Sequence, residues 1–485
     1  MNIAELHVNF AAVAPSVILS LTAILVMLVD AFSPTARSKD SLAYLGIAGA
    51  TAALFTAMLL SRSAQTGFSG MINHDAFAAF GEVVACAAVI VTLFTAQRDM
   101  RNEGLEKGEY YVLVLAAAAG MALMMSASDL VMLFLGLELM SIPVYALVGF
   151  NRYSLRSGEG SFKYFVLGSF ATGFLLYGAA LIYGAVGSTA YADIAAKAAG
   201  GVLKSNVYFA AGTILLLAAL AFKVSAVPFH MWTPDVYQGA PMSITGFMSA
   251  GVKAAAFVSL ARLLFAVFGS AGDVFFGLLW ALAAVTMVAG NLLALVQSNI
   301  KRMLAYSSVG HAGYLLVALA AGSPGGTSAM LFYLLVYALA NLGAFAVATA
   351  LSGEQEADEI ESWAGVGYAR PWLGAAMAVF MLSLASIPPT AGFFGKFYMF
   401  KEAIDRGLVN LAIVGMLGSA IGVYYYLRVI VYMYMKEAPG GARIAPVEGA
   451  LGFGLTLTSL GVVFFGVWPG RLLEIAERSV VGLFK

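Results

Sequence analysis

Long apolar runs follow one another along almost the whole chain, and they restrict its fold more than any other feature. A helix needs about 20 mostly apolar residues to cross the ~30 Å hydrocarbon core of a bilayer. Charged residues make up 11% of the chain, whereas a soluble domain carries about a quarter. The sequence therefore predicts an all-α, polytopic integral membrane protein with about fourteen transmembrane helices. The expected spans are 10–31, 41–61, 74–97, 109–126, 128–150, 159–187, 206–238, 241–268, 274–296, 300–321, 327–351, 371–403, 408–434 and 447–468.

Two of these spans, 206–238 and 371–403, contain prolines inside their apolar sequence. The prolines are Pro228 and Pro234 in the first span and Pro388 and Pro389 in the second. Proline removes a backbone donor and clashes with the preceding turn, so we expect each helix to open there. Open backbone at membrane depth persists only where it is buried in protein or lines a hydrated cavity.

The two interrupted spans lie five spans apart, which predicts an internal duplication. An odd number of spans in each unit inverts the second unit relative to the first across the membrane. The predicted division is 1–108 for helices 1–3, 109–268 for the first repeat of helices 4–8, 269–434 for the inverted repeat of helices 9–13, and 435–485 for helix 14 and an amphipathic tail at the membrane surface. Inverted repeats with broken helices are typical of transporters, whose ion path lies at the repeat interface. Two proline kinks with purely structural roles remain the alternative.

A few ionisable residues lie inside or beside the apolar spans. They are Glu138, Lys163, Lys223, His230, Lys253, His311 and Lys396. Glu138 stands about ten residues into its span, so at 1.5 Å per residue it lies roughly 15 Å deep, near the middle of the core. A buried charge without a partner costs several kcal/mol, so we expect these groups to pair with one another or to lose their charge.

An acid, several amines and an imidazole at similar depth predict a proton relay along the plane of the membrane. Lys163 enters its span from the side at which the span of Glu138 ends. We therefore expect Glu138 and Lys163 to form a switch pair, whose opening or closing changes the proton affinity of Lys223.

Simpler roles remain open for several of these residues. Lys163 could extend to the membrane interface as an ordinary flanking lysine. His230 could satisfy the opened backbone in its break, and His311 could make one core hydrogen bond. Asp129 and Asp235 lie near span ends, and we interpret them as structural.

The sequence contains no motif for a cofactor, a metal or a nucleic acid. It has no glycine-rich dinucleotide-binding fingerprint, no P-loop and no His-Glu-x-x-His segment. The single cysteine, Cys86, permits neither an intrachain disulfide nor a cysteine-ligated cluster. The acidic segment 352–371 is typical of a solvated loop rather than a metal site. A net charge of zero provides no basic surface for nucleic acid.

Three segments carry a resemblance to a known family: "GLELMSIPVYALVGF", "FKVSAVPFHMWTPDVYQGAP" and "NIKRMLAYSSVGHAGY". Over nearly its full length the chain resembles the antiporter-like membrane subunits of proton-pumping NADH:quinone oxidoreductase, respiratory complex I. These subunits are related to Mrp-type cation/proton antiporters. Within the family the chain resembles the N-type subunits most. Lys396 stands where the M type typically has glutamate, and the segment "TPDVYQGAP" is also typical of the N type.

The resemblance implies a role for each ionisable residue. Glu138 and Lys163 correspond to the switch pair, Lys223 to the first half-channel, Lys253 to the connecting lysine, and Lys396 to the exit site. His230 and His311 are expected to take part in the same relay. It also implies fourteen helices in two inverted five-helix units.

The resemblance further implies a translocase subunit without a redox centre of its own. Other membrane and peripheral subunits would hold the flavin, the iron–sulfur clusters and the quinone, and quinone reduction there would drive proton export through this chain. The implied location is a bacterial inner membrane. Twelve Lys and Arg residues lie in the loops of one side and four in those of the other, so the positive-inside rule places both termini on the outer face. An Mrp-type cation/proton antiporter subunit is the alternative function.

Overall fold

The computed structural model describes residues 8–33, 39–201, 206–268, 273–352, 358–437, 447 and 449–484, and these residues are mainly helical. Twelve helices in this part of the chain are long and apolar enough to cross a membrane. They are η2–α1 (Phe10–Val13 and Ala14–Ala31), α2 (Asp40–Leu60), α3 (Ala76–Asn102), α4 (Gly108–Ser126), α5 (Leu130–Val148), α6 (Leu155–Val186), α10–η3–α11 (Met242–Phe247, Met248–Val252 and Lys253–Val267), α12 (Asp273–Leu295), α13 (Ile300–Ala320), α14 (Pro324–Leu351), α18 (Val409–Met435) and α19 (Gly449–Val467). The chain is therefore a polytopic, helical membrane protein, as the sequence predicts.

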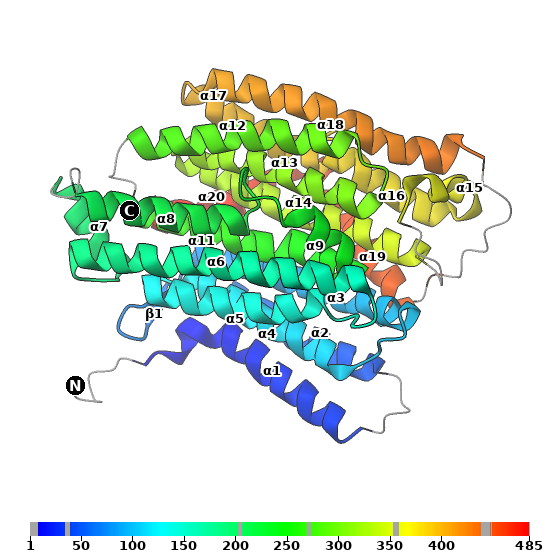
Figure 1. The fold of residues 1–485 in the computed structure, drawn as a ribbon, viewed down its shortest axis with the longest axis horizontal. Coiled ribbons are helices and arrows are strands. Elements are labelled where there is room, and N and C mark those ends of the chain that lie inside the picture. The colour runs from blue at the N-terminus through cyan, green and yellow to red at the C-terminus, as the bar shows by residue number, and fades with distance from the viewer. Residues whose placement is uncertain are drawn as a thin grey trace.

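The helices lie side by side along the long axis of the molecule, with α1 at one edge and α17 and α18 at the opposite edge (Figure 1). The most deeply buried spans are α13, α14 and the helix formed by α10, η3 and α11. By contrast, only about a third of the residues in the apolar segments of α2, α6 and α18 are buried. Residues on the central helices are therefore surrounded by protein, whereas the outer helices present apolar faces to their surroundings.

The two spans that contain the prolines are broken in the structure. The first consists of α8 (Val207–Lys223) and α9 (Thr233–Gly239), and the second of α16 (Pro371–Leu384) and α17 (Ala391–Asp405). Pro228, Pro388 and Pro389 lie in the open segments between these helices. Pro234 instead lies in the first turn of α9, where a proline interrupts nothing because that turn has no intrahelical acceptor for its amide.

Both breaks have the same backbone geometry. Two residues after the end of each first helix stands a serine with positive φ, Ser225 at 63° and Ser386 at 60°. The next residue donates its amide to a carbonyl five residues back, from Ala226 to Ala221 at 2.9 Å and from Ile387 to Leu382 at 3.0 Å, as in a Schellman motif. A cis proline follows in both segments, at Pro228 and at Pro389. The features occur in the same chain order, as two copies of one unit require whatever their orientation in the membrane.

Backbone contact between neighbouring helices depends on glycines at two places. A Cβ added to Gly120 of α4 would lie 2.2 Å from the amide nitrogen of Met140 in α5. A Cβ added to Gly290 of α12 would lie 2.3 Å from the amide nitrogen of Gly310 in α13. Small residues allow membrane helices to pack closely, which is favourable in a medium as apolar as their side chains.

Several elements outside the spans are not predicted from the sequence. A short hairpin pairs β1 (Gln65–Gly67) with β2 (Ile72–His74), and α7 (Tyr191–Ala199) follows α6. Both lie at one end of the bundle, at the left in Figure 1, and we call this end the hairpin face. Short helices η4 (Ile360–Trp363), α15 (Val366–Ala369) and η5 (Val481–Phe484) complete the elements that the structure describes.

The predicted amphipathic tail forms α20 (Pro469–Val480). Its buried residues include Leu472, Ala476 and Val480, and the helix packs against α14 and α3. The apolar stripe therefore faces the protein, while Ile475 is exposed on another side of the helix.

Replacing Gly290 by alanine tests the contact between α12 and α13. The added Cβ must push the two backbones apart, and overpacking of this kind costs about 2 kcal/mol. We expect a lower midpoint of thermal unfolding in detergent for Gly290→Ala. Gly173→Ala is the control, because a Cβ at Gly173 of α6 meets no atom within 4 Å. Equal midpoints for the two variants would contradict the backbone contact.

Candidate functional site

The first cluster of polar groups lies on one face of α5. Glu138, Ser141 and Tyr145 are spaced three and four residues apart, which places them on the same side of the helix. Lys223, the last residue of α8, donates from Nζ to Ser141 Oγ at 2.8 Å and to Tyr145 Oη at 3.2 Å. Glu138 Oε1 accepts a hydrogen bond from Thr172 Oγ1 at 2.6 Å. Lys223 is therefore held by hydroxyl groups, one turn and two turns along the helix from the carboxylate.

Aromatic rings complete the environment of Lys223, which is only 2% exposed. Its Nζ lies 5.4 Å from the ring centroid of Tyr145, 5.8 Å from that of Tyr164 and 5.7 Å from that of Phe222. Ring faces attract a cation without offering it a formal negative charge. Glu138 acts on Lys223 electrostatically rather than through a direct hydrogen bond.

Lys163 does not pair with Glu138 in this structure, so the switch pair stays a prediction. Its Nζ lies 2.5 Å from Glu159 Oε1 and 2.8 Å from Asp235 Oδ2, and its side chain is 39% exposed. The reason is the break after α8, because α9 packs against α6 and brings Asp235 to the lysine.

Asp235 joins three helices. Besides Lys163 of α6, it accepts a hydrogen bond from Arg302 Nη1 of α13 at 2.9 Å, while Asp235 itself belongs to α9. The sequence places this residue near a span end and favours a structural role, which agrees with its position. Its pairing with Lys163 also connects it to the predicted relay.

The second cluster is centred on Lys253, which is 2% exposed. It follows directly on η3, a π-helical segment inside the α10–α11 helix. Such segments are rare and occur often at functional sites. Lys253 donates from Nζ to the backbone carbonyl of Ser308 in α13 at 2.7 Å and also to the hydroxyl of the same residue.

His311 stands one turn beyond Ser308 on α13 and is held between two tyrosines. Its Nδ1 lies 2.5 Å from Tyr333 Oη, and its Nε2 lies 2.8 Å from Tyr426 Oη. The hydroxyl of Tyr426 also bonds to that of Ser307. Lys253 and Lys396 both act electrostatically on His311.

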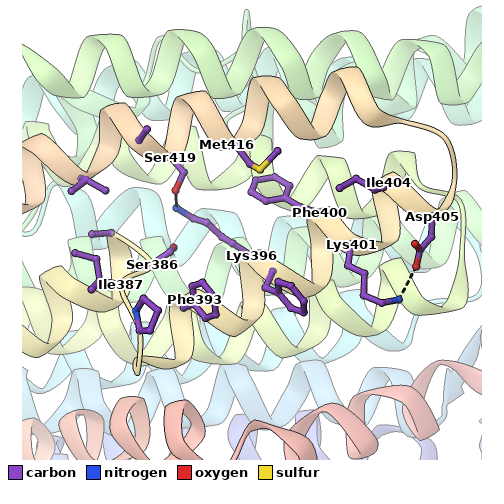
Figure 2. Close-up of a pocket in the computed structure, with 15 residues that line it drawn as sticks. Ser386, Ile387, Phe393, Lys396, Phe400, Lys401, Ile404, Asp405, Met416 and Ser419 are labelled. Carbon is purple, nitrogen blue, oxygen red and sulfur yellow. Dashed lines mark hydrogen bonds and ion pairs between the residues drawn. The ribbon is translucent and has the colours of Figure 1, made fainter.

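Lys396 of α17 lines a cavity of about 550 Å³. Its Nζ donates to Ser419 Oγ of α18 at 3.0 Å and to the Leu384 carbonyl at 3.4 Å, and it lies 4.2 Å from the ring centroid of Tyr314. Figure 2 shows the lysine reaching toward Ser419, with Lys401 turned toward Asp405 farther along α17. Lys396 is 4% exposed.

His230 lies in the first break, in the segment that follows Lys223. Its backbone carbonyl accepts a hydrogen bond from the amide of Thr233 at the start of α9, at 2.9 Å. Its Nδ1 is buried and has no hydrogen-bond partner among the described residues. This contact is made by the backbone and does not involve the ring, and within the described part no hydrogen bond joins the ring to Lys223 or Lys253.

The hydroxyl groups around the lysines are the part of the site that sequence reasoning misses. Ser141 and Tyr145 follow Glu138 by three and seven residues, and Ser308 precedes His311 by three. Hydroxyls one or two turns from an intramembrane charge are therefore a usable signal. Tyr333 and Tyr426 give no such signal, because they stand in helices without a charged residue nearby on the same face.

The arrangement suits proton exchange rather than substrate binding. A hydroxyl both donates and accepts, and a neutral imidazole does so through its two nitrogens. Amines, hydroxyls and one imidazole follow one another through the buried centre of the bundle. Among the described residues, no group of three or more His, Cys, Asp or Glu side chains is arranged to hold a metal ion.

Comparisons with known proteins agree with the geometry. Residues 127–422 match the family model described as NADH:quinone oxidoreductase/Mrp antiporter, transmembrane. The chain is 45% identical to NADH-quinone oxidoreductase subunit N of Trichlorobacter lovleyi over 99% of both chains. It is 33% identical to a chain of respiratory complex I from Thermus thermophilus, with a TM-score of 0.81 over 96% of this chain and 99% of that one. A chain of the Mrp complex from Dietzia sp. has a TM-score of 0.85 at 21% identity, over 98% of both chains, and shows the fold alone.

Replacing Asp235 by asparagine tests the three-helix junction. The variant loses its ion pairs with Lys163 and Arg302 together. Because these groups remain partly screened by solvent, we expect a loss of stability of about 1 kcal/mol, measured as a lower thermal midpoint in detergent. Asp405→Asn is the matched control, since it breaks only the exposed pair with Lys401 and should leave the midpoint unchanged. If the junction does not stabilise the fold, both variants will have the wild-type thermal midpoint.

Proposed function

The chain belongs to the NADH:quinone oxidoreductase/Mrp antiporter family of membrane proteins, and on this basis we propose that it is a proton-translocating membrane subunit of a respiratory NADH:quinone oxidoreductase. Its own residues move protons, and the redox chemistry takes place in partner subunits. It acts as part of a translocase only within the assembled complex.

The observation that carries this proposal is the way the three buried lysines are held. Lys223, Lys253 and Lys396 each donate to a serine hydroxyl, and among the described residues none lies within 4.0 Å of a carboxylate oxygen. A buried ammonium fixed by a carboxylate is locked in its charged form, because separating the pair is costly. Neutral partners impose a much smaller penalty when the amine releases its proton, so each lysine can take up and release protons.

The second cluster provides the steps of a path. Lys253 passes a proton toward Ser308, and His311 with its two tyrosine partners carries it toward Lys396. Lys396 then releases it into the cavity beside α17 and α18, which is the exit site. Hydrogen bonds join Lys253 to Ser308 and His311 to Tyr333 and Tyr426, and water molecules carry the proton across the remaining gaps.

The first cluster regulates the proton affinity of Lys223. Lys163 is bonded to Asp235 of α9, whereas Glu138 of α5 is bonded to Thr172, nine residues farther along α6. We propose that Lys163 exchanges Asp235 for Glu138 during the cycle. Its arrival would neutralise Glu138 and so lower the proton affinity of Lys223. His230, in the break next to Lys223, admits protons to this cluster.

The membrane topology follows the same proposal. Counting each broken pair, α8–α9 and α16–α17, as one span adds two to the twelve long helices and gives fourteen. The units 109–268 and 269–434 are inverted repeats, supported by the matching geometry of their breaks. Residues 1–108 precede them, and 435–485 follow. Both termini lie on the outer face of a bacterial inner membrane.

Electrons reach the complex outside this chain. Other membrane and peripheral subunits hold the flavin, the iron–sulfur clusters and the quinone, and quinone reduction there drives the exchange at Lys163. Relatives that cover the full chain bear the name of an NADH-quinone oxidoreductase subunit, which favours this function over an Mrp-type cation/proton antiporter. Purification in mild detergent separates the two, because only the first predicts copurifying flavin and iron–sulfur proteins. Sodium/proton exchange with membrane partners alone would support the second.

Replacing Lys223 by alanine tests the relay. We expect Lys223→Ala to insert and assemble normally, while proton pumping and the coupled quinone reduction fall about tenfold or more, as for loss of a positioned proton carrier. Both are measured in proteoliposomes containing the assembled complex. Arg478→Ala is the control, because Arg478 forms an exposed pair with Glu474 on α20. Pumping by Lys223→Ala at wild-type rate and stoichiometry would contradict its role.

Replacing Tyr426 by phenylalanine removes only the hydroxyl that joins His311 to Ser307. We expect slower pumping with an unchanged amount of assembled complex, because the ring still fills its place in the core. Tyr432→Phe provides the matched control on the same helix, where the hydroxyl bonds to the exposed Glu361. Equal pumping rates for the two variants would remove Tyr426 from the path.

A further inference from the structure

A second polar cavity lies at the hairpin face, far along the chain from Lys396. It has a volume of about 860 Å³ and is lined by the hairpin turn, the start of α7, the ends of α11 and α12, and η5. Its polar lining includes Asn73, Asp75, Asp193 and Arg262. None of these residues belongs to the relay described above, and we call this space the hairpin cavity.

A buried acid–base pair lies directly behind the hairpin cavity. His74, the last residue of β2, has its Nε2 2.9 Å from Glu82 Oε2 of α3. The His74 and Glu82 side chains are 0% and 2% exposed. The neighbouring Asp75 lines the cavity, so one peptide unit separates a cavity-lining residue from the buried pair.

The start of α3 is already anchored without this pair. Asp75 Oδ1 accepts a hydrogen bond from the amide of Ala78 at 2.9 Å and so caps the helix. Arg262 of α11 binds both oxygens of Asp75, at 3.0 and 2.6 Å. This charged, bidentate contact ties α3 to α11. Capping and packing of α3 are therefore provided by Asp75 and Arg262, and neither explains why His74 and Glu82 are buried.

The histidine is also prepared for proton exchange. Its Nδ1 is buried and has no hydrogen-bond partner among the described residues, so one ring nitrogen is free while the other binds Glu82. Burial lowers the pKa of His74, but the hydrogen bond and charge of Glu82 more than offset this and raise the pKa above its usual value. The ring therefore accepts a proton despite its burial.

The pair lies close to the level of Lys253. A Cβ on Gly81 of α3 would contact Val258 of α11, and one on Gly251 would contact Ala88. The two helices thus run antiparallel, and this register sets Cys86 of α3 level with Lys253. Glu82 is one helical turn nearer the hairpin face, an offset of about 6 Å along the helix axis.

From this juxtaposition we propose that His74 and Glu82 form a proton port between the hairpin cavity and Lys253. A proton taken up at His74 Nδ1 releases the proton on Nε2 to Glu82, and Glu82 passes it through water to a neutral Lys253. The reverse sequence releases a proton to the hairpin face. The relay of Lys253 would then have an opening separate from the cavity beside Lys396. The inference rests on the proposed function, since it presumes that Lys253 carries protons.

Substitutions at Glu82 test the port in the assembled complex. Glu82→Gln keeps the shape and the contact with His74 but removes the titrating group, whereas Glu82→Asp keeps a carboxylate. We expect proton pumping in proteoliposomes to fall about tenfold for Glu82→Gln, with largely preserved pumping for Glu82→Asp and a loss for His74→Asn. Glu474→Gln is the control, because Glu474 pairs with Arg478 on the exposed side of α20.

Lys253→Ala, measured in parallel, separates failure of the port from failure of the proposed function. If Lys253→Ala abolishes pumping while Glu82→Gln pumps at the wild-type rate, the port is wrong and the proposed function stands. If neither substitution changes pumping, both are wrong.

Infrared difference spectroscopy distinguishes a port from a structural pair. During turnover, a port predicts a change in a carboxyl band that is absent from Glu82→Gln and shifted in Glu82→Asp. A pair that only stabilises the fold predicts no such band, and that result would overturn the proposal even if Glu82→Gln assembled poorly.

Discussion

The structure depends on how a membrane protein holds an ammonium group away from water. Charge at membrane depth is costly, and a carboxylate partner would remove the cost by fixing the proton in place. Lys223, Lys253 and Lys396 instead receive hydroxyls, a carbonyl or aromatic rings. These partners stabilise the charge enough for the chain to fold and leave it free to change. Serines and tyrosines facing the centre of the bundle are therefore as much a part of the site as the lysines.

The two breaks use one backbone design for different chemistry. When their serines and cis prolines are aligned, Lys223 corresponds to Leu384, and Asp235 corresponds to Lys396. The first break thus places a lysine before the open segment and an acid after it, whereas the second places a lysine after it. The Lys396 ammonium donates to the backbone carbonyl of Leu384. Leu384 is the residue of the second unit that corresponds to Lys223 in the first. Equivalent backbone therefore holds its lysine before the break in one unit and after it in the other.

The sequence predicts the parts of this structure that depend on the membrane itself. Apolar length determines the spans, and proline chemistry determines where Pro228 and Pro389 open them. Contacts across helices were not predictable in the same way. The expected pair of Glu138 and Lys163 assumed that neighbouring spans face each other at one level, but the break lets α9 fold back and present Asp235 instead. The π-helical turn before Lys253 also leaves no mark in the sequence, because it is set by packing.

Helix α13 connects the two clusters mechanically as well as chemically. Its first turn carries Arg302, which shares Asp235 with Lys163, and its middle carries Ser308 and His311, the partners of the second cluster. If Lys163 leaves Asp235, the contact between Asp235 and Arg302 changes at the first turn of α13. The same helix positions Ser308 and His311. Because α13 is among the most buried helices, it cannot bend into solvent to absorb that change. Under the proposed function, loss of the Lys163–Asp235 pair would be transmitted along α13 to the groups around Lys253.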